Sequence, residues 1–237
     1  MKYHVSLVIV PIDDFTNRVI TKNELKFSAK GEKPAIWKQG FYIFLDLQQT
    51  EITLQVESKC YQKQEIHMSI EGRETKILKL RMIPNERYRT NGSCTVVTGR
   101  GIPEEVVTFY SDELGQSFRL SKEYRRESFL EIYHAAGLDF TGKMVWIKGR
   151  EQDWFVTLGE LSEEVDNQYE IAPLQDDIRK LEASLYLVHE TKCSADGSFY
   201  LLLPNGKSEE FRGRFVCGEK ELDILLHNNK INQIEFE

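Results

Sequence analysis

The 237-residue chain has no long apolar run and only four cysteines. No stretch approaches the roughly 20 apolar residues that a membrane-spanning helix needs, so we expect none. Cys60, Cys94, Cys193 and Cys217 show no Cys-x-x-Cys spacing, which argues against a zinc site. In a reducing compartment such residues are usually small buried hydrophobes, and in an oxidising one Cys60 and Cys94 are able to pair, so the sequence leaves both states open.

Positive charge is also scarce, with 31 Lys and Arg against 38 Asp and Glu and a formal net charge of −7. Nucleic acids and anionic membranes bind through clustered positive charge, so we expect neither as a partner. The N-terminus lacks a small-residue cleavage site and alternates like a first strand. We therefore expect a cytoplasmic protein, which is able to join a larger particle after synthesis.

Alternating apolar and polar residues recur along the chain. Ile52, Leu54 and Val56 alternate with polar neighbours, and the same period of two recurs in residues 66–70 and 211–217. This period is typical of half-buried strands, and turn-forming Gly and Asn residues separate the runs. The pattern predicts an all-β protein of tandem small β-sandwiches, of the immunoglobulin or transthyretin-like type.

One segment has a helical pattern, and two polar segments mark candidate domain boundaries. Residues 173–185 place leucines and Ile178 at helical spacing after a Pro, which predicts one short helix or a structured linker. Polar breaks occur around Pro84 and in residues 160–168. They predict three units: a transthyretin-like β-sandwich at 1–83, a second β domain at 84–165, and a short helix with a third β unit at 166–237.

The first unit carries an ordered set of residues: a strand at 5–12, Asp13 and Thr16 in an Asp-x-x-Thr turn, Gly40 before Phe41 and Tyr42, an alternating strand at 52–57, and Tyr61. This order resembles the transthyretin-like or carboxypeptidase-regulatory-like family of β-sandwiches. Cys60 departs from the family, which usually has Gly before the Tyr. The third unit repeats only the centre of the pattern, at 196–201. The resemblance implies a non-catalytic module of a larger protein or assembly, although a fold alone does not define a function.

A turn glycine followed by an aromatic strand occurs at Gly40 and again at Gly197, with a looser instance at Gly115. We expect each glycine to take a positive φ and the aromatic pair that follows to enter a sandwich core. Chance recurrence and true internal repetition explain the similarity equally well.

The chain lacks a local catalytic signature. Residues 137–143 match the Gly-x-x-x-x-Gly-Lys of a P-loop, but Met144 replaces the Ser or Thr that holds Mg²⁺, and a strand pattern follows where a helix is required. We expect a hairpin turn there. No nucleophile elbow and no local His or Cys ligand pattern occurs, so we predict no catalytic residues, no cofactor and no metal.

The three tryptophans, Trp37, Trp146 and Trp154, are the candidate ligand or partner contacts, although core packing is the more common role of such large rings. The sequence predicts a non-catalytic structural or adaptor subunit that binds other protein subunits, with a phage tail or contractile injection apparatus as the kind of host. A carbohydrate-binding module with a glycan partner is the first alternative. An enzyme with a dispersed active site is the second.

Overall fold

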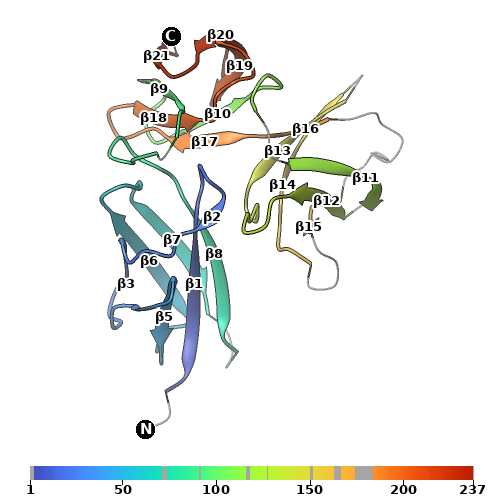
Figure 1. Ribbon diagram of the computed structural model, residues 1–237. Coiled ribbons are helices and arrows are strands. Elements are labelled where there is room, and N and C mark those ends of the chain that lie inside the picture. The colour runs from blue at the N-terminus through green and yellow to red at the C-terminus, as the bar shows by residue number, and fades with distance from the viewer. Residues whose placement is uncertain are drawn as a thin grey trace. The chain divides into compact units, whose positions relative to one another are not determined.

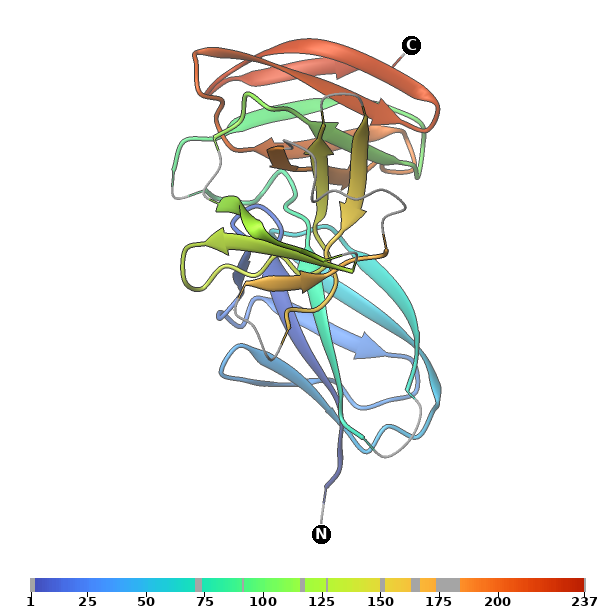
Figure 2. The ribbon, with the colours of Figure 1, turned by 90° about the vertical axis from the view of Figure 1, so that its right-hand side faces the viewer.

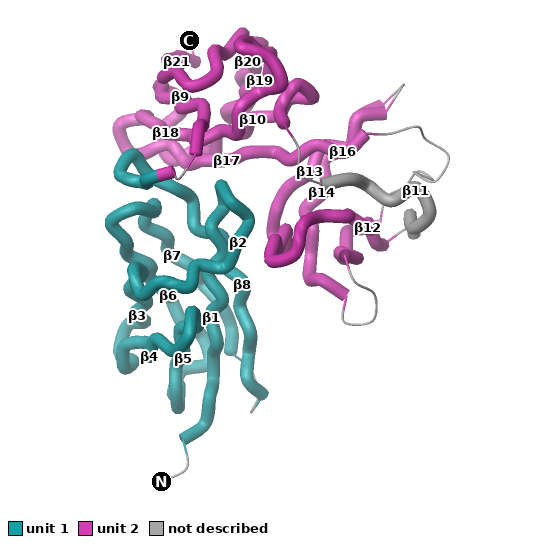
Figure 3. Tube along the Cα trace, viewed as in Figure 1, with its two compact units in different colours: residues 1–89 teal, residues 90–237 magenta. Residues whose placement is uncertain are grey.

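The computed structural model of the chain describes residues 3–70, 74–90, 92–115, 118–126, 128–149, 152–162, 167–173 and 184–236, with 118–126 described by their backbone alone. Every regular element within these ranges is a β-strand (Figure 1), so the predicted all-β class is confirmed. The chain divides into two compact units, Met1–Arg89 and Thr90–Glu237 (Figure 3).

The first unit is a sandwich of two sheets. In one sheet β1 pairs in parallel with β8, antiparallel with β5 and β2, and β5 pairs with β4. The second sheet has the order β3, β6, β7. The bounds are β1 (Val5–Asp13), β2 (Arg18–Val19), β3 (Leu25–Ala29), β4 (Ile36–Lys38), β5 (Phe41–Leu45), β6 (Glu51–Ser58), β7 (Gln64–Ser69) and β8 (Lys76–Met82).

The core of this sandwich follows the alternation that the sequence predicts. Ile52, Leu54 and Val56 are all buried on one face of β6, while their neighbours point away from the core. Phe27 of β3 and Tyr42 of β5 meet between the sheets with ring centroids 4.6 Å apart. Apolar residues therefore cover the inner faces of both sheets, as burial in a sandwich requires.

The second unit contains a sandwich with similar pairing. One sheet has the order β17, β10, β19, β20, and the other the order β18, β9, β21, in which β9 and β21 are parallel. The bounds are β9 (Thr95–Arg100), β10 (Val106–Tyr110), β17 (His189–Lys192), β18 (Ser198–Leu203), β19 (Glu210–Cys217), β20 (Lys220–His227) and β21 (Ile231–Glu235).

Six strands lie between β10 and β17 in the chain, and they form an insertion with a core of its own (Figure 1, Figure 2). They make two three-stranded sheets, β11-β12-β15 and β14-β13-β16. The bounds are β11 (Phe118–Arg126), β12 (Phe129–His134), β13 (Met144–Lys148), β14 (Asp153–Thr157), β15 (Gln168–Glu170) and β16 (Ser184–Leu187).

This arrangement differs from the three predicted segments. Strands β9 and β10 belong to the predicted segment 84–165, yet β9 pairs with β18 and β10 pairs with β19, which both belong to 166–237. The reason is the insertion, because a sandwich interrupted in sequence cannot be divided at a single boundary. The predicted helix at 173–185 falls mostly on residues 174–183, which lie outside the described residues, and Leu185 belongs to β16.

The two turn glycines have equivalent roles. Gly40 has a φ of 90° and Gly197 a φ of 82°, which confirms the predicted positive φ at both, whereas the prediction was wrong for Gly115, which has no positive φ. Two residues after each glycine, Tyr42 and Phe199 are buried, with 2% and 5% of their surfaces exposed. One aromatic of each pair thus enters the core and the other does not, since neighbours on a strand point to opposite faces.

The Gly-x-x-x-x-Gly-Lys segment forms a turn, as predicted. The Lys143 N–H donates to the Phe140 carbonyl at 2.9 Å, and β13 begins at the next residue, Met144. A phosphate-binding P-loop needs a helix at that point, so this segment lacks the geometry of a nucleotide site.

Candidate functional site

The outer face of the β10-β19-β20 sheet carries a row of polar side chains. Tyr110 is the register partner of Arg214, which in turn is the partner of Asp223. One step along the strands, Arg212 is the partner of Leu225. Cross-strand partners share a face, so these five side chains lie on the side of the sheet away from the core.

A glycine maintains the packing beneath this row. Gly213 lies between Arg212 and Arg214 on the inner side of β19, where a Cβ would be 2.2 Å from the Phe109 ring. Phe109 is fully buried and stacks against Phe215 at 4.5 Å. The absence of a side chain at Gly213 therefore lets the core ring approach the strand whose outer face carries the two arginines.

The insertion contributes aromatic rings next to this row. Val145 and Ile147 enter the core of the insertion, so Trp146 between them points to the opposite face. The Trp146 ring contacts Tyr110 at 5.0 Å and Tyr186 at 5.3 Å. Phe155 contacts Tyr110 at 5.0 Å and leaves 47% of its own surface exposed.

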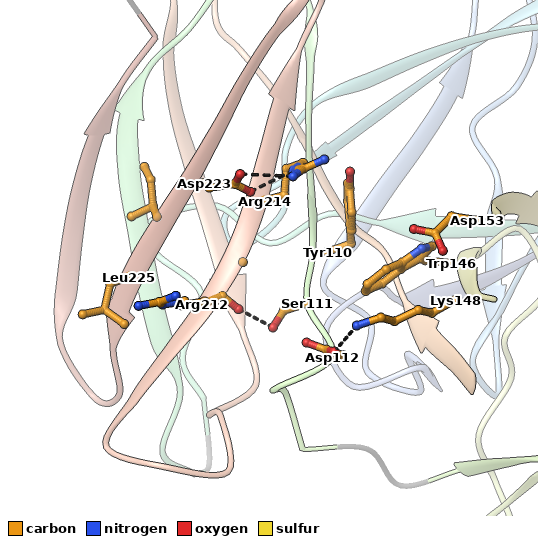
Figure 4. A pocket seen from close by; sticks show the side chains of 12 residues that line it. Tyr110, Ser111, Asp112, Trp146, Lys148, Asp153, Arg212, Arg214, Asp223 and Leu225 are labelled. Atoms are coloured by element: carbon orange, nitrogen blue, oxygen red, sulfur yellow. Dashed lines mark hydrogen bonds and ion pairs between the residues drawn. The ribbon is translucent and has the colours of Figure 1, made fainter. Parts of the chain in front are cut away.

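Between the sheet and these rings lies a cleft of about 660 Å³ within the second unit (Figure 4). We call it the aromatic cleft. Its lining is balanced in charge, because three cations and three anions contribute to it: Lys148, Arg212 and Arg214, and Asp112, Asp153 and Asp223.

Two pairs among these charges neutralise each other. Arg214 donates two hydrogen bonds to Asp223, at 2.8 and 3.1 Å, and this contact lowers the pKa of the Asp223 carboxyl. Lys148 donates to Asp112 at 2.5 Å, and that hydrogen bond raises the pKa of the lysine. Burial raises the pKa of the Tyr110 phenol, so it stays protonated at neutral pH.

Three other polar groups of the cleft remain unpaired among the residues that the structure describes. The Arg212 guanidinium and the Asp153 carboxylate, both on exposed residues, have no hydrogen-bond or ion-pair partner there, and the line that Figure 4 draws to Arg212 joins its backbone carbonyl to the Ser111 hydroxyl. Trp146 is 7% exposed, and its buried Nε1 has no acceptor within the described ranges. A buried donor without an acceptor costs about 1–3 kcal/mol, and this cost applies to the enclosed Trp146 Nε1 and not to the two exposed charged groups.

A second distinctive surface lies on the first unit. Ile77, Val8, Ile43 and Ile36 are successive register partners across β8, β1, β5 and β4, so they form a row on one face of the sheet. Ile77 is 63% exposed and Ile36 53% exposed. With Phe41, which shares the face of Ile43 and is 41% exposed, they make what we call the apolar stripe.

The three tryptophans occupy different environments. Trp146 lines the aromatic cleft, whereas Trp154 on the adjacent strand pairs with Ile147 and packs against the core of the insertion. Trp37 belongs to the first unit, pairs with Tyr42 on the edge strand β4, and is 39% exposed. Of the three, the structure therefore brings only Trp146 into the cleft.

Sequence reasoning missed the lining residues Tyr110, Arg212 and Asp153 and the neighbouring Phe155. Tyr110 had a detectable signal, since it alternates with the buried Val107 and Phe109 and so faces outward. The pairing that brings strands from distant segments together has no such local signal.

A buried polar cluster closes one end of the first sandwich. The Asp13 carboxylate accepts hydrogen bonds from the Tyr61 and Tyr88 hydroxyls, at 2.7 and 2.6 Å, and from the backbone N–H groups of Phe15 and Thr16. Burial, together with the hydrogen bond to Asp13, raises the pKa of both tyrosines well above the ordinary value. We call this the Asp13 cluster and assign it a structural role, because its members bond to one another and are enclosed.

The four cysteines are free thiols. Cys193 and Cys217 are buried, and a Cβ at Gly101 would lie 2.9 Å from the Sγ atoms of both. Burial and the neighbouring Cys217 raise the pKa of the Cys193 thiol to about 11. The sequence had instead suggested Cys60 and Cys94 as a pair for an oxidising setting.

Comparisons with protein-family models and with curated proteins found no match to this chain. Within the described residues, no three His, Cys, Asp or Glu side chains gather closely enough to hold a metal ion. The same ranges contain no helix that is long and apolar enough to cross a membrane. The function must therefore be argued from the two surfaces themselves.

Proposed function

We propose that this protein is a non-catalytic structural or adaptor subunit of a larger protein assembly, made in the cytoplasm, and that its first sandwich docks another subunit through the apolar stripe. A phage tail or a contractile injection apparatus is the kind of host that we favour. The observation that carries the proposal is the exposure of Ile77, Ile36 and Phe41 on one sheet face.

Exposure of these apolar residues to water is unfavourable, and docking of a partner would bury them. Burying an isoleucine contributes about 1.5–3 kcal/mol, and contiguous exposed apolar patches are typical of interaction sites. The flanking Lys38 and Lys79 share the face of Ile36 and Ile77 and give the stripe a polar rim, as binding surfaces commonly have. The stripe therefore suits a partner with an apolar centre and an acidic margin.

The edge strand β4 supports the same role. Its three residues are all exposed, and β4 ends the order β2-β1-β5-β4 in the described sheet. Exposed sheet edges accept a strand from a partner through backbone hydrogen bonds. The free thiols agree with a reducing compartment, and the resemblance to transthyretin-like modules agrees with a non-catalytic role.

The test is the size and composition of the complex that contains the full chain in an extract of its native source. We expect a complex of fixed stoichiometry by native mass spectrometry, which the Ile36→Lys, Ile77→Lys double variant abolishes. Ile231→Lys on β21 is the matched control, because Ile231 is 74% exposed and belongs to the second unit.

Two results would contradict the proposal. One is a wild-type chain that elutes as a free monomer from the native extract. The other is a complex that persists in the double variant, with circular dichroism showing that the variant is folded.

A further inference from the structure

We propose that the aromatic cleft of the second unit is a binding site for a neutral glycan. This inference does not depend on the docking role of the first unit, because the two surfaces share no residue. It starts from the three unpaired groups of the cleft, the Arg212 guanidinium, the Asp153 carboxylate and the buried Trp146 Nε1.

Arg212 and Asp153 are exposed residues of the cleft, and a ligand that replaces the water around them must both accept and donate hydrogen bonds. Arg212 and the Trp146 indole only donate, whereas the Asp153 carboxylate only accepts. A sugar hydroxyl does both, so a ligand with several hydroxyls in a ring suits the two exposed charged groups without bringing a charge of its own, whereas the Trp146 Nε1 is enclosed.

The rings of the cleft supply the apolar half of the site. Tyr110 and the largely enclosed Trp146, which is 7% exposed, line it, and Phe155, which contacts Tyr110 beside the cleft, leaves 47% of its surface exposed. The carbon face of a sugar ring is apolar and flat enough to stack on such rings, which combine a large contact area with polar tips. The cleft volume of about 660 Å³ also falls among small-molecule sites, which span roughly 300–1,000 Å³.

The charges of the cleft argue against an anionic ligand. Arg214 is held by Asp223, and Lys148 by Asp112, so two of the three cations are already neutralised. The remaining Arg212 is balanced by Asp153, and no net positive field is left to attract a phosphate or a carboxylated chain. A purely apolar ligand is equally unsuited, because it would strip water from these charges without replacing it.

The experiment is affinity electrophoresis of the full chain through gels that contain one polysaccharide each: mannan, β-glucan, galactan or xylan as neutral probes, and polygalacturonate as the acidic one. We expect retardation by at least one neutral probe. Arg212→Ala and Asp153→Asn should each weaken the binding about tenfold, since each removes a hydrogen bond to a charged group.

Matched controls separate the cleft from the general surface. Arg87→Ala and Glu86→Gln change exposed charges of the first unit, and both should leave the retardation unchanged. Arg212 and Asp153 have no side-chain partner among the described residues, so their variants should also fold normally, whereas Trp146→Ala risks the packing of two neighbouring rings.

The proposal is overturned by no retardation on any neutral probe, by retardation that the Arg212→Ala and Asp153→Asn variants retain, or by retardation on polygalacturonate alone. Absence of any complex of the wild-type chain in the native extract, together with intact glycan binding, would reject the docking role and leave this inference standing. The reverse outcome would reject the glycan site alone.

Discussion

The two sandwiches share a strand order but differ in what their surfaces offer. In each, the first strand pairs in parallel with the last, β1 with β8 and β9 with β21, and antiparallel with the strand after a positive-φ glycine. In each, a hairpin dominates the second sheet, β6-β7 or β19-β20. The first sandwich exposes an apolar face on the sheet that contains β1, whereas the second exposes a polar face beside aromatic rings on its other sheet, β10-β19-β20.

The insertion accounts for the aromatic rings beside the second sandwich. In the first unit β4 pairs with β5, but in the second unit β17 emerges from the insertion and pairs with β10 in the other sheet. The insertion thus begins and ends beside β10, and its β13 places Trp146 against Tyr110. The same fold thus carries two kinds of surface, because the insertion places additional side chains beside the second sandwich only.

The same end of each sandwich is also closed by different chemistry. After β1 the first unit has the Asp13 cluster, in which a carboxylate meets two tyrosine hydroxyls. After β9 the second unit has Gly101, against which Cys193 and Cys217 pack closely. A buried polar network is stable only when every member has a hydrogen-bond partner, whereas packed thiols need only a close fit with their neighbours. We therefore expect the two ends to respond differently to substitution.

The largest effect should follow from Asp13→Ala. Loss of the carboxylate leaves the Tyr61 and Tyr88 hydroxyls buried without their acceptor, which we expect to destabilise the first sandwich by about 3 kcal/mol or more. In hydrogen exchange read by mass spectrometry, β1, β5 and β8 should lose protection while β9 and β18 keep it.

Asp196→Ala is the control for that experiment, because Asp196 is an exposed turn carboxylate that accepts hydrogen bonds from Ser194 and Ser198. It should change the protection of its own turn and little else. Equal loss of protection in both sandwiches after Asp13→Ala would mean that the two units do not unfold independently, and the comparison between them would fail.

The sequence was sufficient for the strands because a buried face imposes a period of two. Ile52, Leu54 and Val56 show this, and so does the Gly197 turn, whose positive φ follows from the need for a tight reversal. The apolar stripe was not predicted, although Val8 and Phe41 stand in expected strands, because outward exposure depends on which sheet covers which face.

The aromatic cleft was beyond sequence reasoning for a related reason. Trp146 was singled out as a large ring, but Tyr110, which it contacts, and Arg212, which lines the same cleft, lie in distant segments that only the pairing of β10 with β19 brings to one face. Six inserted strands separate β10 from β19 in the chain, so a prediction that assumes continuous domains does not place these two strands in one sheet.

A smaller effect should follow from Gly213→Ala, which tests whether the second sandwich depends on shape as the first depends on polar contacts. The new Cβ would lie 2.2 Å from the Phe109 ring, so the ring or the strand must move. Such overpacking costs about 1–3 kcal/mol, measured as a lower urea midpoint for the second unit.

Gly92→Ala is the matched control, because nothing lies within 4 Å of a Cβ at Gly92. The double variant Gly213→Ala, Phe109→Leu should recover part of the loss by making room for the methyl group. A midpoint for Gly213→Ala equal to that of Gly92→Ala would show that the core beneath the arginines is loosely packed, which would contradict the close fit described above.

The smallest effect concerns the Cys193 and Cys217 thiols. They lie at the end of the second sandwich that corresponds to the Asp13 cluster of the first. The pKa of Cys193 is raised to about 11, so the folded state favours the protonated thiol. Because the folded pKa exceeds the unfolded one, the stability from this group is complete below about pH 8.5 and declines as the pH rises toward 11.

Iodoacetamide labelling mapped by mass spectrometry should modify the half-buried Cys60 and Cys94 first, and Cys193 only as the pH approaches 11 or after unfolding in urea. Modification of Cys193 at about pH 8 at the rate of Cys60 would mean that this end of the second sandwich opens readily, and that close packing of thiols closes it less firmly than the hydrogen bonds of Asp13 close the first.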